Sequence, residues 1–248
     1  MAAGGSEFCL TSVVHYLTAR AQSGALAARF VAVVVRRSPM AGIVTADSAL
    51  AEPADLSGRR VGGPSGSKLV AEYQATLAHL GLRPSVVVPV PYADAPAALG
   101  RGDVDVVPDF ADLIPRTRRQ AGVDVRAVRL PLDVYASGLV AGDDVAGELV
   151  DRMVDAVRAA LQHQRAEPRA GVEELRRRYP EADPADAVEG WGLVEPNVFA
   201  GANPGAMDAA TWGRTIDFLS GAHRFPAVVP ASVFRPELAV AGGSRWPE

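Results

Sequence analysis

Small hydroxyl residues gather where a short apolar strand gives way to a helix, in the segment Gly63-Pro64-Ser65-Gly66-Ser67. Apolar residues follow at helical spacing, at Leu69, Val70, Tyr73, Leu77 and Leu80. This pattern predicts a helix that starts near Ser67 and ends at Gly81, because glycine is favoured just past a helix C-terminus. The Ser65 and Ser67 hydroxyls, with the unpaired N–H groups of a helix N-terminus, suit an anion. The alternative is an ordinary capped helix in an α/β layer.

The spacing in this segment does not match either common nucleotide motif. A P-loop needs adjacent glycine and lysine, whereas Ser67 separates Gly66 from Lys68. The glycines also lack the spacing of the dinucleotide fingerprint. A ligand bound here is therefore not expected to be a nucleotide, and the sequence indicates no cofactor.

Cys9 is the one cysteine of the chain, so no internal disulfide and no cysteine-based zinc site can form. The four histidines lack metal-ligand spacing, so no metal site is indicated. Cys9 is a candidate nucleophile, with His15 as its base one to two helical turns away. The favoured interpretation of Cys9 is instead a small buried hydrophobic residue beside Phe8 and Leu10.

The composition excludes two classes of partner. The 248 residues carry a net charge of −4 with 48% hydrophobic residues, which is typical of a globular protein without an electrostatic footprint for nucleic acid. The basic run at 116–119 is interpreted as a solvated helix face. No apolar run is long enough to span a membrane. The first residues do not have the pattern of a secretion signal, so the chain as written is expected in the cytoplasm. If the natural N-terminus is longer, the expected location is outside the cytoplasm.

Strands and helices alternate along the chain, which predicts βαβ units and an α/β fold with a parallel sheet. Strands are expected at Arg29–Arg36, Ile43–Thr45, Arg60–Gly62, Ser85–Val90, Val125–Val128 and Ser137–Ala141. A further strand is expected in the last part of the segment 100–108, ending at Pro108. Helices are expected at Val13–Ala21 with Ser12 as N-cap, Asp94–Leu99, Ala111–Ala121, Val145–Gln164, Val172–Tyr179 and Met207–Leu219. Phe8–Ser12 is either a short buried strand or a helix entry, Gly190–Asn197 is expected to be a loop, and Ala231–Phe234 a turn.

Ligands of parallel sheets bind beyond the carboxyl ends of the strands. Here those ends are expected at Gly63–Ser67, Tyr92 and Asp109. Asp109 has two interpretations: it pairs with an amine of a ligand, or it caps the helix that follows.

Several motifs occur in an order that is found in a known family. The order is SPMAGIV (38–44), an Asp-Ser pair (47–48), PADLSGRRVG (53–62), ALGRGDVDV (98–106), YASGLVA (135–141) and MDAATWGRTIDFL (207–219). Together they cover the chain from about Gly5 to Leu238. The chain resembles the substrate-binding proteins of nitrate/sulfonate/taurine-type ABC transporters and the related thiamine-pyrimidine synthase-like proteins.

The resemblance implies a type 2 periplasmic-binding-protein-like fold of two α/β lobes with a ligand between them. Lobe I comprises residues 1–57 and 131–248, and lobe II comprises 58–130, with crossings near 47–57 and 130–137. The residues that it places at the ligand are Thr11, Ser12, Ser38, Met40, Ser65, Gly66, Ser67, Asp109 and Tyr135. It also implies a second interpretation of His15, as a residue that stacks on a heteroaromatic ligand.

The chain departs from the family at its start, where the first β-α-β unit of the family is missing. An unpaired sheet edge is therefore expected beside the Arg29–Arg36 strand. The expected function is capture of a small organic ligand (sulfonate-, carboxylate- or pyrimidine-like) for an ABC permease, with no arginine placed as a clamp. The alternatives are a cytoplasmic enzyme on the same scaffold, desulfinase-like or cofactor-biosynthetic and using Cys9 and His15, and a non-functional remnant.

Overall fold

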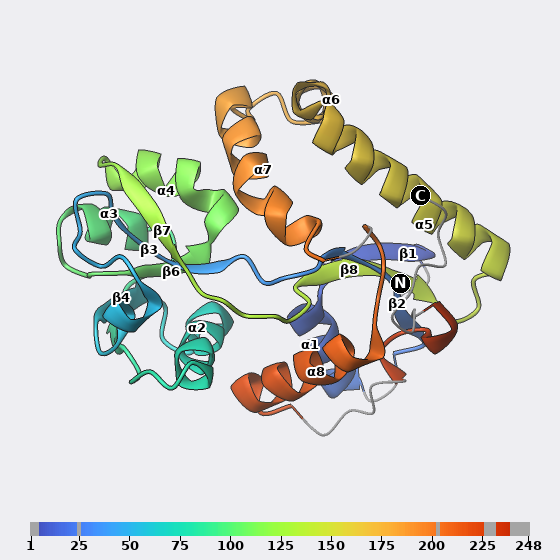
Figure 1. Cartoon of the computed structure of the whole chain (residues 1–248), viewed down its shortest axis with the longest axis horizontal. Helices are drawn as coiled ribbons and strands as arrows, with labels where there is room; N and C mark the ends of the chain where they lie inside the picture. Colours follow the sequence, from blue (N-terminus) through green and yellow to red (C-terminus); the bar gives the residue numbers. More distant parts are fainter. Residues whose placement is uncertain (1–4, 24–25, 202–203, 226–231, 239–248) are drawn as a thin grey trace. The chain divides into compact units, whose positions relative to one another are not determined.

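The first sheet is built from three strands, β1 (Phe8–Ser12), β8 (Ser137–Gly142) and β2 (Ala28–Val35), in the order β1-β8-β2 (Figure 1). β8 runs antiparallel to both neighbours. The expectation of a parallel sheet is therefore wrong for this part of the chain. The reason is topological: the chain leaves the sheet at the end of β2 and returns at that same end, where Ser137 opposes Val35 and Ser12. These descriptions cover residues 5–23, 26–201, 204–225 and 232–238 of a computed structural model.

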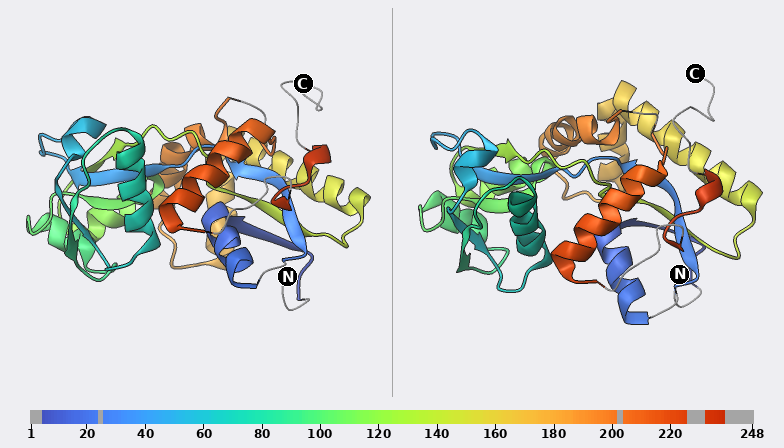
Figure 2. Two further views of the ribbon diagram at one scale, coloured as in Figure 1. Left: turned by 90° about the horizontal axis from the view of Figure 1, so that it is seen from below. Right: turned by 60° about the horizontal axis from the view of Figure 1, so that its bottom comes forward.

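Helices cover both faces of this sheet. On one face, α1 (Val13–Ser23) and α8 (Ala209–His223) lie side by side (Figure 2). Their apolar residues surround Phe30 of β2, whose ring centroid lies 4.9 Å from that of Trp212, and Trp212 stacks on Phe234 at 5.5 Å. On the other face, Val150 and Val154 of α5 (Gly147–Ala166) pack against the strands. The β-branched run of β2 is thus buried on both faces, as its sequence predicts.

The two outer strands of this sheet, β2 and β1, differ in whether other segments bond to their outer edges. The outer edge of β2 bonds to the segments around Gly205 and Phe234. In the described part of the chain, β1 pairs with β8 alone. The open edge that we expected beside Arg29–Arg36 therefore lies at β1 instead. Cys9 on β1 is exposed, so the prediction of a buried cysteine is wrong, because among the described residues this strand has a neighbour on one side only.

The second sheet has parallel and antiparallel parts. β3 (Met40–Thr45) lies between β6 (Val107–Phe110) and β7 (Val125–Arg129) and is antiparallel to both. β4 (Arg60–Gly63) and β5 (Val86–Pro89) are parallel, and a parallel bridge from Val61 to Val106 joins β4 to β6. The carboxyl ends of β4, β5 and β6 therefore lie at one end of this sheet, as predicted.

Helices also cover both faces of the second sheet. α2 (Lys68–His79) packs Tyr73 and Leu77 on one face. The other face carries α3 (Ala95–Gly100) and α4 (Ile114–Ala121), the latter preceded by the 3-10 turn η2 (Ala111–Leu113). The remaining helical elements are η1 (Pro53–Leu56), α6 (Pro168–Arg178), α7 (Pro184–Val198) and η4 (Pro236–Leu238).

The α7 helix replaces the loop expected at Gly190–Asn197. Its two internal glycines and Pro196 argued against a helix, but tertiary contacts outweigh them. A side chain at position 190 would meet the Asp112 carbonyl oxygen at 2.8 Å, so glycine allows α7 to approach η2 closely. Arg118 of α4 also donates to both carboxylate oxygens of Glu189, at 2.9 and 2.7 Å.

The chain divides into two compact units. The first contains Met1–Ser38, Asp133–Gly171 and Glu195–Glu248, and the second contains Pro39–Leu132 and Val172–Val194. The boundary after Ser38 falls earlier than the lobe boundary at residue 57 that the resemblance implies. β3 belongs to the second unit because both of its neighbours in the sheet, β6 and β7, lie there. Of the expected turn at Ala231–Phe234, position 231 lies outside the described residues.

Candidate functional site

The Gly63–Ser67 loop connects β4 to α2, as its sequence predicts. The Ser67 hydroxyl accepts from the Val70 N–H at 3.5 Å and caps the helix. The Ser67 N–H donates to the Pro64 carbonyl at 3.1 Å, which closes the turn. Gly66 has a φ of 72°, a left-handed conformation that glycine adopts without strain. Ser65 and Gly66 are exposed, so the turn presents a hydroxyl and main-chain donors at the N-terminus of α2.

Asp109, the penultimate residue of β6, lies at the same end of the sheet, as a buried residue that is 5% exposed. Its Oδ2 accepts from the Tyr92 hydroxyl at 2.9 Å, and its Oδ1 accepts from the Phe110 N–H at 2.9 Å. Burial raises the pKa of Asp109, and burial together with Asp109 raises the pKa of Tyr92 to about 12. The residue before η2 is Phe110, and no side chain caps that turn. The interpretation of Asp109 as a helix cap is therefore wrong.

The predicted residues of this unit do not all lie on one face of the sheet. Val107 packs on the side of α3 and α4, so Asp109, two residues later, points to that side. Ser67, the N-cap of α2, lies on the opposite side of the sheet, which α2 covers. Met40 is also on the α2 side, where it is 1% exposed and part of the apolar core. The structure thus brings Asp109 together with Tyr92, and leaves Ser65 and Ser67 as a separate group at the same strand ends.

In the first unit, Thr11 and Ser12 lie at the end of β1, beside the start of β8. Ser12 caps α1 as predicted, because its hydroxyl accepts from the His15 N–H at 3.2 Å. The same hydroxyl lies 2.7 Å from Nδ1 of His15. His15 therefore bonds to Ser12, while the Cys9 thiol contacts the Leu10 carbonyl at 3.5 Å. The register also places Ser137 directly opposite Ser12, which the sequence did not indicate.

Tyr135 and Ser38 are buried rather than open. Tyr135 is 1% exposed, and its hydroxyl donates to Oδ2 of Asp208 at 2.8 Å. Burial, reinforced by this bond, raises the pKa of Tyr135 to about 12. Burial also opposes ionisation of Asp208, but bonds from Thr211 and Tyr135 outweigh it and hold the pKa of Asp208 below its usual value. Ser38 is 4% exposed, and its carbonyl accepts from the Asn197 side chain at 3.2 Å.

The sequence analysis did not single out three arginines that lie around the segment from Asp133 to Tyr135. The Arg36 guanidinium lies 5.6 Å from the centre of the Tyr135 ring. Arg37 and Arg214 each bond to Asp133 at 3.1 Å, so two cations share one carboxylate. The pair at 36–37 directly follows a buried strand, which is the one local signal that these residues lie at a strand end.

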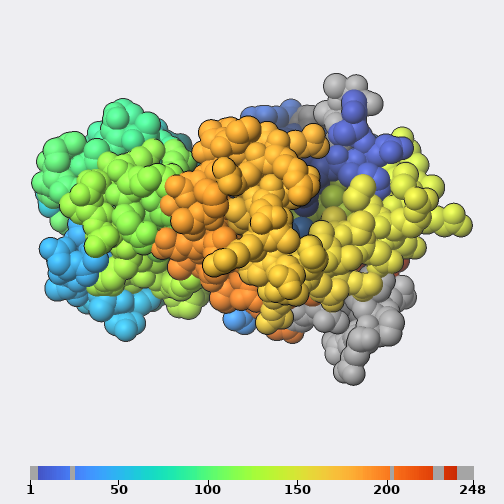
Figure 3. Space-filling model, turned by 90° about the horizontal axis from the view of Figure 1, so that it is seen from above, coloured from blue at the N-terminus to red at the C-terminus, as the bar shows by residue number. Residues whose placement is uncertain are grey.

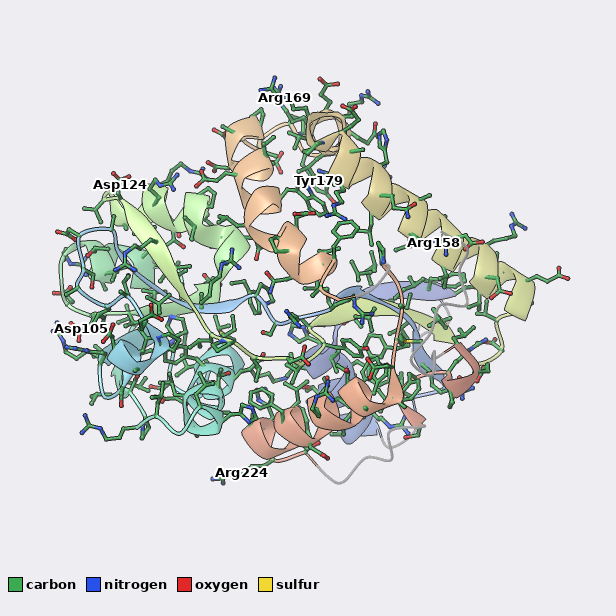
Figure 4. The ribbon with its side chains drawn as sticks, viewed as in Figure 1. Asp105, Asp124, Arg158, Arg169, Tyr179 and Arg224 are labelled. Atoms are coloured by element: carbon green, nitrogen blue, oxygen red, sulfur yellow. The ribbon has the colours of Figure 1, made fainter. Side chains whose placement is uncertain are left out.

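No group of His, Cys, Asp and Glu within the described ranges has a geometry that could hold a metal ion. None of the helices in the described segments has both the length and the apolar character needed to cross a membrane. Figure 4 labels Arg158 on α5, whose half-buried side chain bonds to Asp155 of the same helix at 3.0 Å.

These features define an α/β protein with the fold of two-lobed periplasmic binding proteins. The NMT1/THI5-like family model matches residues 1–170, and the chain therefore belongs to this family. Comparison with curated protein sequences gives no significant match.

Three solved structures illustrate the likeness. The aliphatic sulphonate-binding protein SsuA from Escherichia coli superposes with a TM-score of 0.72 at 16% identity, over 92% of this chain and 79% of that protein. The alkanesulfonate-binding protein SsuA from Xanthomonas axonopodis pv. citri, bound to MOPS, gives 0.64 at 18% identity, over 96% and 81%. A cysteine-to-serine mutant of DszB in complex with biphenyl-2-sulfinic acid gives 0.64 at 17% identity, over 93% and 83%.

Proposed function

We propose that this chain is a solute-binding protein that captures a small organic ligand and delivers it to an ABC permease. The ligand carries a sulfonate, carboxylate or pyrimidine-like group. The candidate contacts are hydroxyl groups and main-chain donors at strand ends, namely Ser65–Ser67 in the second unit, and Thr11 and Ser12 in the first.

The observation that carries this proposal is the exposed turn at Ser65 and Gly66. It presents polar donors at the N-terminus of α2, beyond the carboxyl ends of parallel strands, where such folds bind ligands. Family membership and the likeness to the two SsuA proteins support the same function. Ser38, Met40 and Tyr135 contribute less directly, because their side chains are buried and each is at most 4% exposed.

A thermal-shift screen tests the proposal with an alkanesulfonate, the carboxylate of equal length and a substituted pyrimidine. A ligand at roughly 100 times its dissociation constant stabilises the folded state by about 2.7 kcal/mol. For a chain of this size, we expect the melting temperature to rise by roughly 5–10 °C. The absence of a shift with every member of the three classes would overturn the proposal.

Two variants locate the binding residues. Ser65→Ala removes an exposed hydroxyl, so we expect unchanged stability and a roughly five- to tenfold weaker affinity by calorimetry. Thr11→Ala removes a half-buried hydroxyl in the first unit. If both weaken the same ligand, both units contribute to its binding. Gln162→Ala, at an exposed position of α5, is the matched control and should leave the affinity unchanged.

The exposed Cys9 thiol favours a second candidate function, a desulfinase-like enzyme. The structural likeness to DszB, solved with an arylsulfinate, is consistent with it. In this reaction a sulfinate and water would give the desulfinated arene and hydrogen sulfite. The test is release of sulfite from an arylsulfinate by the native chain and by Cys9→Ser. Equal release by both proteins, or none by either, would rule this function out.

A further inference from the structure

The three arginines of α4 have different surroundings. Arg118 and Arg119 lie in the last turn of the helix, where the negative end of the helix dipole favours a cation. Each also pairs with an acidic residue of α7, Arg118 with Glu189 and Arg119 with Asp186. Figure 3 shows α4 (green) at the surface beside α7 (orange). These two arginines therefore help to hold α7 in place.

Arg116 has neither of these advantages. It is the third residue of α4, where the positive end of the helix dipole disfavours a cation. The side chain is exposed, and no ion pair or hydrogen bond joins its guanidinium to any residue of the described segments. The helix thus carries a positive charge at its less favourable end, and no carboxylate of the described residues pairs with that charge.

The Arg116 guanidinium is held over the ring of Tyr92. It lies 5.5 Å from the ring centre, which is within the range of a cation–π contact. Tyr92 is itself fixed, because its hydroxyl donates to Oδ2 of the buried Asp109 at 2.9 Å. Oδ1 of Asp109 accepts from the Phe110 N–H at 2.9 Å. Both oxygens of Asp109 are thus engaged by other donors, and neither bonds to Arg116.

This group stands at the strand ends where ligands of such sheets bind. Tyr92 follows the last residue of β5 by three positions, and Asp109 is next to last in β6. β4 is parallel to β5 and is joined to β6 by a parallel bridge, so both strand ends point the same way. Arg116 is therefore fixed, through Tyr92, beside the carboxyl ends of two strands.

The chemistry of a guanidinium in this position suits an oxyanion. A contact with a ring face engages the positive charge but none of the five N–H donors. Those donors form a planar fork that matches two oxygens of a sulfonate or a carboxylate. A side chain that is already held against a ring also loses less freedom when it binds a ligand.

We propose that Arg116 binds the oxyanion of the ligand, a sulfonate or a carboxylate, and that Tyr92 positions Arg116 for this contact. The inference rests on the solute-binding function proposed above, and it adds a residue that distinguishes anions from uncharged pyrimidines. A bound anion gains charge-assisted hydrogen bonds and offsets the positive charge at the start of α4.

Calorimetry with three probes of equal chain length tests the proposal: an alkanesulfonate, an alkanecarboxylate and, as their uncharged counterpart, an alkyl methyl sulfone. In Arg116→Gln, we expect the affinity for the better-bound anion to fall roughly ten- to hundredfold, because hydrogen bonds between charged groups are lost. The sulfone should bind the native chain and the variant alike. Arg116→Lys keeps the charge but not the fork of donors, so its loss of affinity should be smaller.

Arg119→Gln is the matched control. It removes one positive charge from an exposed position of the same helix, where the native arginine pairs with Asp186. An exposed ion pair contributes little to stability, so the variant should fold normally and bind the anion with unchanged affinity.

A double-mutant cycle tests the role of Tyr92. Tyr92→Leu removes the ring beneath the guanidinium and should weaken binding of the anion roughly two- to fivefold. In an Arg116→Gln background the same change should have little further effect, because Tyr92 acts through Arg116. Losses that simply add would overturn the positioning role of Tyr92.

The results separate the role of Arg116 from the function on which it rests. If the native chain binds an anion that Arg116→Gln binds equally well, the role of Arg116 is overturned and the solute-binding function stands. The same conclusion follows if Arg116→Gln and Arg119→Gln weaken binding equally, or if the native chain binds a pyrimidine but neither anion. If no member of the three ligand classes binds, the solute-binding function fails and the role of Arg116 with it.

Discussion

Tyr135 and Asp208 are joined by two hydrogen bonds, although they are 73 residues apart in the sequence. The Tyr135 hydroxyl donates to Oδ2 of Asp208 at 2.8 Å and accepts from the Asp208 N–H at 2.9 Å. Asp208 also caps α8 through Thr211. The segment that leads into β8 is thereby tied to the N-terminus of α8, and Tyr135 acts as a structural support rather than as an open ligand contact.

Tyr135→Phe should destabilise the protein by about 1–2 kcal/mol, because it leaves the N–H and one carboxylate oxygen of half-buried Asp208 without this partner. Urea unfolding measures the effect. Tyr179→Phe is the control, since Tyr179, labelled in Figure 4, is 53% exposed and the change should affect the stability very little. Equal effects of the two changes would contradict the support role of Tyr135.

Asp109→Asn should change the pH dependence of stability. The pKa of Asp109 in the folded state is raised, chiefly by burial, above its usual value of 3.8. The contribution of the native carboxyl is therefore fully present below that value and is lost as the pH rises through the raised pKa. Asparagine does not titrate, so the stability of the variant relative to the native protein should increase with pH across this window.

Unfolding of both proteins at a series of pH values from about 3 to 8 checks this expectation. Asp112, whose pKa is also raised by burial, and Arg116, beside the Tyr92 ring, are present in both proteins, so the comparison isolates Asp109. A difference in stability that stays constant with pH would contradict the raised pKa.

Gly138→Ala should destabilise the first sheet. A Cβ atom at this position would lie 2.3 Å from the Ala32 carbonyl oxygen, so β8 and β2 would have to move apart. Overpacking of this kind typically costs about 1–3 kcal/mol. Gly213→Ala in α8 is the matched control: it meets nothing within 4 Å and should stabilise the helix by roughly 0.5–1 kcal/mol. Thermal unfolding should shift in opposite directions for the two variants.

The Arg118–Glu189 pair between α4 and α7 should contribute modestly and lose strength in salt. Both side chains are 38–40% exposed, so water screens their attraction. A double-mutant cycle with Arg118→Gln and Glu189→Gln should give a coupling of about 1 kcal/mol or less, falling towards zero at about 1 M salt. The more exposed Arg177–Glu174 pair, at 71% and 70%, is the control and should show weaker coupling. A coupling that salt leaves unchanged would indicate a buried pair instead.

Much of the local structure was predictable because its causes lie within a few residues of each other. Ser12 and Ser67 each cap a helix through an N–H three residues later, so serine and the apolar spacing suffice to predict both caps. The β-branched run of β2 likewise predicts a buried strand. The order of motifs was enough to identify the family fold.

The tertiary structure decided the rest, because it depends on which distant segments meet. The antiparallel direction of β8 follows from where the chain re-enters the first sheet, and the exposure of Cys9 follows from the pairing of β1 with β8 alone within the described segments. From the sequence alone, Gly190 indicated a loop. Only the close approach of the Asp112 main chain explains why a glycine stands at this position of the α7 helix. Tyr135 and Asp109 carry no local sign of their partners. Local propensities and spacing can be read along the chain, whereas burial and pairing are properties of the whole packed arrangement.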